Sequence, residues 1–124
     1  ANTQIKAGAD VLTGSAQQVV GSIQVAKDAG VYWLGSQSDQ SPLAPDIVVV
    51  NQVYDWTKVI KDMIESHNSG TLGGKVFTMT LNDGGQTTLF NDASTVAPEK
   101  MAEIKAAVEA AAKGIQDGTI VPAK

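Results

Sequence analysis

The first half of the chain alternates short apolar runs with one amphipathic stretch. Apolar runs at residues 9–12 and 31–34 predict two buried strands. Between them, over residues 16–29, apolar residues recur at helical spacing, at Ala16, Val19, Val20, Ile23 and Ala26. A strand, a helix and a strand in this order predict a βαβ unit with parallel strands. A third strand is expected over residues 47–50.

Residues at the ends of these segments predict where the helices begin and end. Ser15 and Gln18 have the Ser-x-x-Gln spacing of a capping box, so the first helix is expected to start there. Gly30 suits the left-handed residue that ends a helix. Asp55 is the expected cap of the next helix, and Gly70 is its expected end.

The second half opens with the clearest amphipathic helix of the chain, at residues 55–67. Alternating residues then predict a half-buried strand over residues 75–81. A turn at residues 82–85 and a short strand over residues 87–90 follow. The apolar face of the helix, which is expected to lie in the core, consists of Trp56, Val59, Ile60, Met63, Ile64 and His67.

The order of the elements is that of an α/β protein. A last helix is expected from Pro98, which suits a first helical position, to Gly118, which closes it. Residues 36–46 contain two prolines and several short polar side chains, which predict an irregular loop. Residues 1–7 resemble the end of a helix, so we expect further sequence of the same fold upstream.

The composition excludes several kinds of partner and chemistry. The net charge is −4, and the nine cationic residues are all lysines interleaved with Asp and Glu, so no nucleic-acid partner is expected. Without arginine, the chain lacks the side chain best suited to bidentate recognition of phosphate. Without cysteine, it has no disulfide, thiolate metal site or cysteine nucleophile. No apolar run approaches the ~20 residues of a membrane span.

Two places in the sequence suit ligand binding. The turn Thr13-Gly14-Ser15 lies between a strand and a helix, where open α/β sheets bind ligands. An ordinary strand-to-helix turn has the same sequence character, so both interpretations stay open. Tyr54 follows the third strand, and its ring suits stacking on a planar ligand in a cleft.

No residue pattern predicts catalysis, a metal or a cofactor. Residues 73–75 (Gly-Gly-Lys) lack the Ser or Thr that completes a phosphate-binding loop, so a turn entering a strand is expected there. No spacing indicates a triad around His67, which is expected to pack against or cap its helix. Asp39 and Asp46 gather no further metal ligands and are expected to shape turns.

Several short stretches occur in an order that is typical of one protein family. They are Gly8-Ala9-Asp10-Val11, the turn at Gly14, residues 26–32, Gly35, residues 38–40, residues 43–46 and residues 118–122. In these stretches the chain resembles the basic membrane protein family, the substrate-binding lipoproteins of ABC transporters. The resemblance covers essentially the whole chain, and residues 39–46 are its most specific part.

The resemblance implies the fold of a type I periplasmic binding protein, with the ligand in a cleft between two α/β lobes. Each lobe of this fold has three layers around a parallel sheet, and the amino-terminal part of the fold is absent from this chain. Residues 1–53 are then expected to belong to the C-terminal lobe. Residues 54–85 are expected to belong to the other lobe, and residues 86–124 to return and end in the terminal helix.

The resemblance also implies where the ligand binds. The family's glycine-rich ligand loop falls on Gly14 and Ser15, and its ribose-binding acid falls on Gln37. A lysine often found after the third strand falls at or near Tyr54. The sequence departs from the family at both of the latter positions, and the expected ligand-binding residues are Gly14, Ser15, Gln37 and Tyr54.

The function implied is that of a solute-binding component of an ABC importer, not of an enzyme. The expected ligand is a purine nucleoside, a nucleobase or a similar polar heterocycle. The expected partners are the permease subunits and the missing amino-terminal part of the same protein. The full-length protein is expected to be exported to the periplasm or cell surface, with a lipid anchor outside this chain as its only membrane contact. Two alternatives stay open: a nucleotide- or sugar-processing α/β enzyme with Asp39 as its acid or base, and a ligand-sensing lipoprotein lobe.

Overall fold

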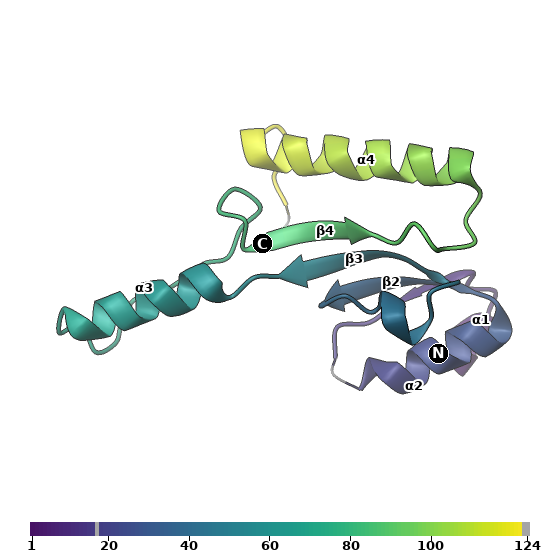
Figure 1. Cartoon of the computed structure of the whole chain (residues 1–124), viewed down its shortest axis with the longest axis horizontal. Coiled ribbons are helices and arrows are strands. Elements are labelled where there is room, and N and C mark those ends of the chain that lie inside the picture. Colours follow the sequence, from purple (N-terminus) through teal and green to yellow (C-terminus); the bar gives the residue numbers. More distant parts are fainter. Residues whose placement is uncertain (17, 123–124) are drawn as a thin grey trace. The chain divides into compact units, whose positions relative to one another are not determined.

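The computed structural model describes residues 1–16 and 18–122 of the 124-residue chain. These residues fall into two compact units: unit 1 contains Ala1–Val53 and Thr88–Val108, and unit 2 contains Tyr54–Thr87 and Glu109–Lys124. Figure 1 shows the elements, which in chain order are α1 (Asn2–Lys6), β1 (Val11–Thr13), α2 (Val19–Ala29), β2 (Tyr32–Gln37), the 3₁₀-helix η1 (Ser41–Leu43), β3 (Val48–Tyr54), α3 (Thr57–Asn68), β4 (Gln86–Phe90) and α4 (Pro98–Asp117).

The strands form one four-stranded sheet in the order β1-β2-β3-β4. β1 pairs in parallel with β2, with Leu12 opposite Trp33, and β2 pairs in parallel with β3, with Gln37 opposite Val53. β4 runs in the opposite direction to β3 (Figure 1). The predicted βαβ unit and the third strand are therefore confirmed, and the chain is an α/β protein with a mostly parallel sheet.

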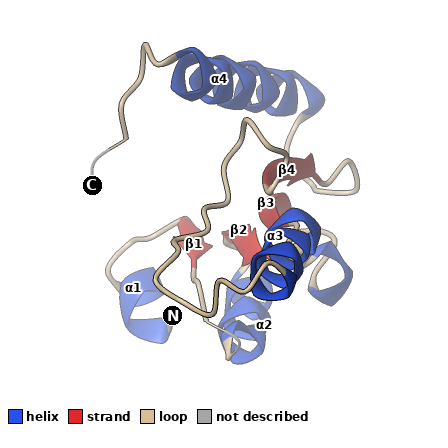
Figure 2. Ribbon diagram, turned by 90° about the vertical axis from the view of Figure 1, so that its left-hand side faces the viewer, coloured by secondary structure: helices blue, strands red, loops and turns tan. Residues whose placement is uncertain are grey.

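The core of unit 1 lies between the sheet and the helices α1 and α2, which lie on the same side of it (Figures 1 and 2). Trp33 and Val48 enter this core from neighbouring strands and Ile23 enters it from α2. Each such burial contributes about 1.5–3 kcal/mol. The core fixes the carboxyl ends of β1 and β2 and thereby positions the loops that follow them. The cluster consists of Leu12, Ile23, Ala26, Trp33, Ala44, Ile47 and Val48.

Helix α2 begins later than the capping-box pattern predicts. Its first residue is Val19, and the side chain of its N-cap residue, Gln18, makes no capping hydrogen bond. The Ser15 carbonyl oxygen instead accepts a hydrogen bond from Gln37 Nε2 (2.9 Å), which ties Ser15 to the end of β2. The predicted start at Ser15 is wrong because this tertiary contact outweighs a local capping preference. The end at Gly30, with a left-handed φ of 66°, is confirmed.

The other expected helix boundaries lie close to the observed ones, although the N-cap of α3 is Trp56 and not the expected Asp55. Asp55 Oδ1 accepts the backbone N–H of Thr57, the first residue of α3, at 2.9 Å. The hydrogen bond from the Thr57 side chain and, after it, this backbone bond lower the pKa of the Asp55 carboxyl. α4 starts at Pro98 and ends before Gly118, whose φ of 80° is left-handed.

No helix in the described part of the chain combines the length and apolar character needed to cross a membrane.

The segment after α3 in unit 2 is not the predicted strand. Residues 75–81 have no strand assignment, although Phe77, Met79 and Leu81 are half-buried and the residues between them are exposed. The alternation predicted correctly which side chains are sheltered. It predicted the strand wrongly, because a strand also needs a neighbour to pair with its backbone. The short strand expected over residues 87–90 is confirmed as β4.

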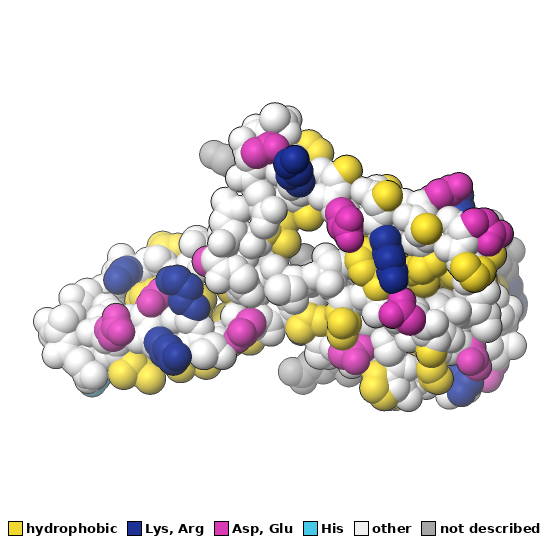
Figure 3. Space-filling view, turned by 45° about the horizontal axis from the view of Figure 1, so that its top comes forward, with side chains coloured by type: hydrophobic (Ala, Val, Ile, Leu, Met, Phe, Trp, Pro, Cys, Tyr) yellow, Lys and Arg dark blue, Asp and Glu magenta, His cyan; other side chains and the backbone are white. Residues whose placement is uncertain are grey.

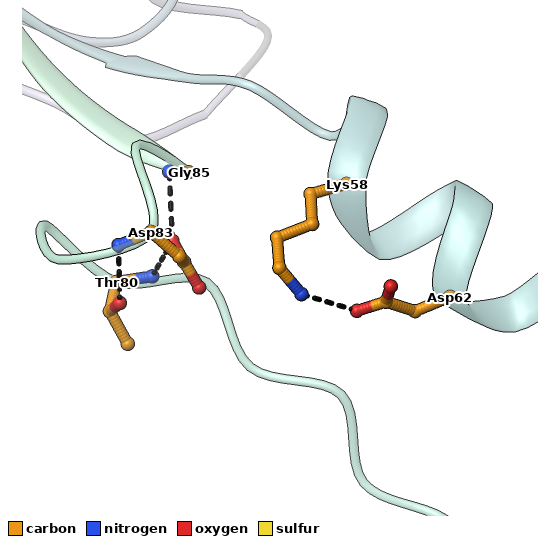
Figure 4. A network of polar contacts seen from close by, with 5 residues as sticks. All are labelled: Lys58, Asp62, Thr80, Asp83 and Gly85. Carbon is orange, nitrogen blue, oxygen red and sulfur yellow. Dashed lines mark hydrogen bonds and ion pairs between the residues drawn. The ribbon is translucent and has the colours of Figure 1, made fainter.

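The turn that leads into β4 is organised by Asp83 (Figure 4). Its Oδ1 accepts backbone N–H bonds from Thr80 (3.0 Å) and Gly85 (2.9 Å), and Thr80 Oγ1 accepts the Asp83 N–H (3.3 Å). The bonds that the carboxyl accepts, first that from Gly85 and then that from Thr80, lower the pKa of Asp83, and the charge of Lys58 lowers it further. Lys58 also pairs with Asp62 at 2.6 Å. A carboxylate thus holds the turn.

The apolar face of α3 is exposed, contrary to the prediction that it lies in the core. Of the α3 residues only Val59 is buried, and Figure 3 shows hydrophobic side chains at the surface along this helix. His67 lies in the last turn, as expected, but it is exposed and not packed. The exposed members of the face are Trp56 (54% exposed), Ile60 (51%), Met63 (47%) and Ile64 (54%).

Candidate ligand site in unit 1

The loop after β1 is tied to the end of β2 by side-chain hydrogen bonds. Hydroxyl and amide side chains of β1, β2 and the loop add hydrogen bonds to those of the paired backbones. Two of the predicted site residues, Ser15 and Gln37, bond to each other directly. The bonds run from Thr13 Oγ1 to the Leu34 carbonyl oxygen (2.8 Å), from Ser36 Oγ to the Gly14 carbonyl oxygen (2.5 Å), and from Gln37 Nε2 to the Ser15 carbonyl oxygen (2.9 Å).

Gly14 allows this loop to pass close over the core. A Cβ at this position would lie 3.0 Å from Val19 Cγ1 and 3.4 Å from Trp33 Cη2, so a larger residue would have to displace one of them. The space that the glycine leaves therefore serves packing within unit 1. Its predicted contact with a ligand stays a prediction.

Gln37 ends β2 in an unusual backbone conformation. Its φ of 73° is positive, which is uncommon for a residue other than glycine, and its side chain is exposed. Such a conformation persists only where its surroundings hold it, and residues of this kind cluster at functional sites. The bond from its side chain to Ser15 is one such restraint.

A surface hollow of about 470 Å³ lies beside Gln37. Its polar lining consists of hydroxyl and amide groups and one carboxylate, that of Asp39, and its apolar lining comes from Ala16, α2 and η1. Such groups can hydrogen-bond and sandwich a small polar molecule. The lining residues are Ala16, Val19, Val20, Ser36, Gln37, Ser38, Asp39, Gln40, Pro42 and Leu43.

Three of the predicted site residues are brought together in unit 1, and the fourth belongs to unit 2. Gln37 lines the hollow, and Gly14 and Ser15 bond to Ser36 and Gln37 at its edge. Tyr54 is the half-buried last residue of β3 and the first residue of unit 2. Its contact with a ligand stays a prediction.

The sequence analysis missed Gln40 and Asn51, two buried amides beneath the hollow. The available signal was weak: Asn51 follows the apolar run of residues 47–50, where a further apolar residue would be ordinary. Asp39 was expected to shape a turn, and it does. Its Oδ1 accepts the backbone N–H of Ser41 at 2.9 Å and the Asn51 Nδ2–H at 3.1 Å.

Metal-binding clusters are not found among the residues that the structure describes, since no three His, Asp or Glu side chains gather there. Asp46 uses its carbonyl oxygen, which accepts bonds from the backbone and hydroxyl groups of Thr95 at 2.8 and 3.0 Å. Lys105, at the edge of a smaller hollow, pairs with Asp92 at 2.7 Å. The hollow beside Gln37 is therefore the candidate site.

Two solved structures share this fold. A transcriptional activator of the comK gene from Bacillus halodurans matches with a TM-score of 0.73 and 18% identity, over 98% of this chain and 42% of its own length. An ABC transporter solute-binding protein from Conexibacter woesei DSM 14684 matches with a TM-score of 0.65 and 17% identity, over 98% and 39%. The chain thus spans about two fifths of the length of these proteins.

The sequence itself identifies the family. No curated protein matches the chain. A family model described as ABC transporter substrate-binding protein PnrA-like matches residues 1–123, which is nearly the whole chain. This agrees with the resemblance carried by residues 8–11, 39–46 and 118–122. The chain belongs to the Bmp family of PnrA-like ABC transporter substrate-binding proteins.

Proposed function

We propose that this chain is part of the solute-binding component of an ABC importer and that its hollow beside Gln37 forms one wall of the ligand site. The observation that carries the proposal is the hollow itself. It lies at the carboxyl end of β2, where open α/β sheets bind ligands, in a chain of a substrate-binding family. The function needs binding without a reaction, so the protein is not an enzyme.

The ligand that this wall suits is a purine nucleoside, a nucleobase or a similar polar heterocycle. The lining offers hydroxyl and amide hydrogen bonds and apolar surface from α2 and η1, which suit a flat molecule with polar edges. Gln37 cannot replace a carboxylate as the charged acceptor of two ribose hydroxyls, because an amide has one carbonyl oxygen and no charge. We therefore expect a ligand without a free ribose diol, or a ribose held by groups outside this chain.

The rest of the site belongs to other parts of the protein in this proposal. The compact units change over at residues 53/54, 87/88 and 108/109. The first two changes support assigning residues 54–85 to the other lobe, with Tyr54 at the crossing, whereas the third does not support the return of residues 109–124. Residues 1–53 and 86–124 then belong to the C-terminal lobe. The partners are the missing amino-terminal part and the permease subunits. The protein works in the periplasm or at the cell surface, anchored by a lipid outside this chain.

A ligand-sensing lobe is the second candidate, because a transcriptional activator shares the fold with a TM-score of 0.73. Genes for a permease and an ATPase beside this one would favour transport over sensing. The enzyme alternative needs Asp39 as acid or base. Asp39 Oδ1 is already engaged by Ser41 and Asn51, and this disfavours the enzyme.

The proposed function is tested with the full-length protein. Mass spectrometry of the small molecule that co-purifies with it is expected to find a purine or a related heterocycle. Calorimetry with adenine and adenosine, on the wild type and on Gln37→Asp, is expected to show that the wild type prefers adenine and that the substitution moves the preference toward adenosine. A wild type that strongly prefers adenosine, together with an unchanged preference in Gln37→Asp, would contradict the role of Gln37. Residues 1–124 alone are expected to bind neither compound measurably.

A further inference from the structure

Two side-chain amides of unit 1 lie almost fully out of water directly beneath the hollow. Asn51, on β3, is 0% exposed, and Gln40, in the loop after β2, is 7% exposed. Burying an amide is unfavourable unless each of its polar atoms finds a partner. Among the described residues, no buried side-chain nitrogen or oxygen lacks one. The two amides are therefore part of a completed network.

Asn51 connects β3 to the loop that forms the rim of the hollow. Its Oδ1 accepts the backbone N–H of Gln40 at 3.1 Å. Its Nδ2 donates to Asp39 Oδ1 at 3.1 Å and to Ser41 Oγ at 2.9 Å. All of these bonds end on residues 39–41, so one side chain fixes three consecutive positions of the loop.

Gln40 connects the same loop to the core and to the end of β2. Its Oε1 accepts the indole N–H of buried Trp33 at 2.7 Å, and its Nε2 donates to the Ser36 carbonyl oxygen at 2.8 Å. Ser36 is the residue before Gln37. The restraint thus reaches the backbone at the point where Gln37 turns into its left-handed conformation.

Gly35 shows how closely Asn51 packs against this backbone. A Cβ at Gly35 would lie 1.9 Å from Asn51 Oδ1 and 3.3 Å from Gln40 Oε1. The two amides therefore occupy the space that a side chain at this point of β2 would need. Buried polar networks of this kind specify a unique geometry, because any other arrangement leaves polar atoms unpaired.

We propose that Asn51 and Gln40 are positioning residues, a buried amide pair that sets the rim of the hollow and the conformation of Gln37. Asn51 does not line the hollow, and Gln40, which does, has its side-chain oxygen and nitrogen engaged by Trp33 and Ser36. The pair acts by holding residues 36–41, which line or support the hollow. The binding part of this inference rests on the proposed function, whereas the positioning of the rim does not.

The positioning is tested without a ligand, through the exchange of indole protons in the full-length protein. Trp33 donates its indole N–H to Gln40, and the loss of one signal in a Trp33→Phe variant identifies its resonance. Asn51→Ala is expected to speed exchange of the Trp33 indole proton at least about tenfold, because Gln40 loses its anchor. Unchanged exchange would overturn the proposal.

The matched control is Asn91, a second buried amide of unit 1 away from the hollow. Its Nδ2 donates to the carbonyl oxygens of Pro45 and Val48, both at 2.7 Å. Asn91→Ala is expected to lower Tm as Asn51→Ala does while Trp33 exchange stays protected. If Asn51→Ala does not fold, Asn51→Ser, whose hydroxyl keeps one donor and one acceptor, gives a milder form of the same test.

Binding separates a positioning role from a purely structural one. With adenine and adenosine as probes, Asn51→Ala is expected to raise Kd about tenfold or more, a change of about 1.4 kcal/mol, and Asn91→Ala is expected to leave Kd unchanged. A lower Tm with an unaltered Kd in Asn51→Ala would show that the pair only stabilises the fold. A wild type that binds neither probe would count against the proposed function, and Trp33 exchange alone would then decide for or against the amide pair.

Discussion

Units 1 and 2 each contain an amphipathic helix, and they use its apolar face in different ways. In unit 1, α2 places Ile23 and Ala26 against the sheet, and both are at most 1% exposed. In unit 2, the more strongly patterned α3 buries only Val59 and leaves the rest of its apolar face in solvent. The contrast teaches that a pattern fixes which face of a helix is apolar, while burial depends on a surface that covers it.

The solved proteins of this fold contain more sequence than this chain matches. Both are more than twice as long as the region that this chain matches, since the match covers 42% and 39% of them. We therefore expect the remainder of the full-length protein to cover the face of α3. Unit 1 should then behave as a finished core and unit 2 as a surface that is completed by other sequence.

The strongest test of this contrast replaces one isoleucine in each unit of the 124-residue chain. Ile23→Ala removes a side chain that is 1% exposed and is expected to cost about 2–5 kcal/mol of unfolding free energy. Ile60→Ala, at a residue that is 51% exposed, is expected to change it by less than about 0.5 kcal/mol. Urea unfolding measures both. Equal losses would show that α3 is as well packed as α2.

The second test uses two glycines of unit 1. Gly35→Ala places a Cβ against Asn51 Oδ1 and is expected to cost about 1–3 kcal/mol. Gly21 lies within α2 with nothing near its absent Cβ, so Gly21→Ala is expected to stabilise by about 0.5–1 kcal/mol. Thermal unfolding of both variants is the measurement. If Gly35→Ala were neutral, the tight fit of Asn51 on β2 would be wrong.

The third test follows Trp56 directly. In the 124-residue chain carrying Trp33→Phe, the fluorescence of Trp56 is expected to be quenched readily by acrylamide, because this residue is 54% exposed. In the full-length protein with the same substitution, quenching is expected to fall several-fold if other sequence covers α3. Equally strong quenching in both would mean that the face of α3 stays in solvent.

The smallest expected effect concerns acid. Hydrogen bonds in the folded turn lower the pKa of Asp83 from 3.8, so its contribution is complete above that pH and is lost as the pH falls through the lower folded pKa. Asp83→Asn is expected to weaken the loss of stability below about pH 4. Urea midpoints at pH 7 and pH 3 measure the difference. If the urea midpoint fell by the same amount between pH 7 and pH 3 in both proteins, the role of this carboxylate would be contradicted.

The sequence predicted what depends on local pattern and failed where distant contacts decide. The parallel strands, the helix ends at Gly30 and Gly118 and the start at Pro98 all follow from short stretches of chain. The capping box at Ser15 failed because Gln37, far along the chain, bonds to the Ser15 carbonyl oxygen. A capping rule based on local spacing cannot predict a hydrogen bond between Ser15 and Gln37.

The candidate site was predicted in part for the same reason. Gly14 and Ser15 were expected from their place after a strand, and Gln37 from a resemblance, and the structure brings all three together. Asn51 belongs to no motif, and the motif that contains Gln40 gives it no role, since both roles depend on where buried partners from β2 and the following loop meet. Only the three-dimensional structure shows which buried groups these two amides meet.

The left-handed backbone of Gln37 has a consequence for changing what this site binds. At a φ of 73°, β-branched residues are strongly disfavoured, whereas Gly, Asn and Asp are the residues that tolerate the conformation best. The backbone conformation therefore limits which side chains position 37 can carry, whatever the ligand is. A library that alters selectivity at this position should be built from small polar residues, and it should yield few folded variants that carry Val, Ile or Thr.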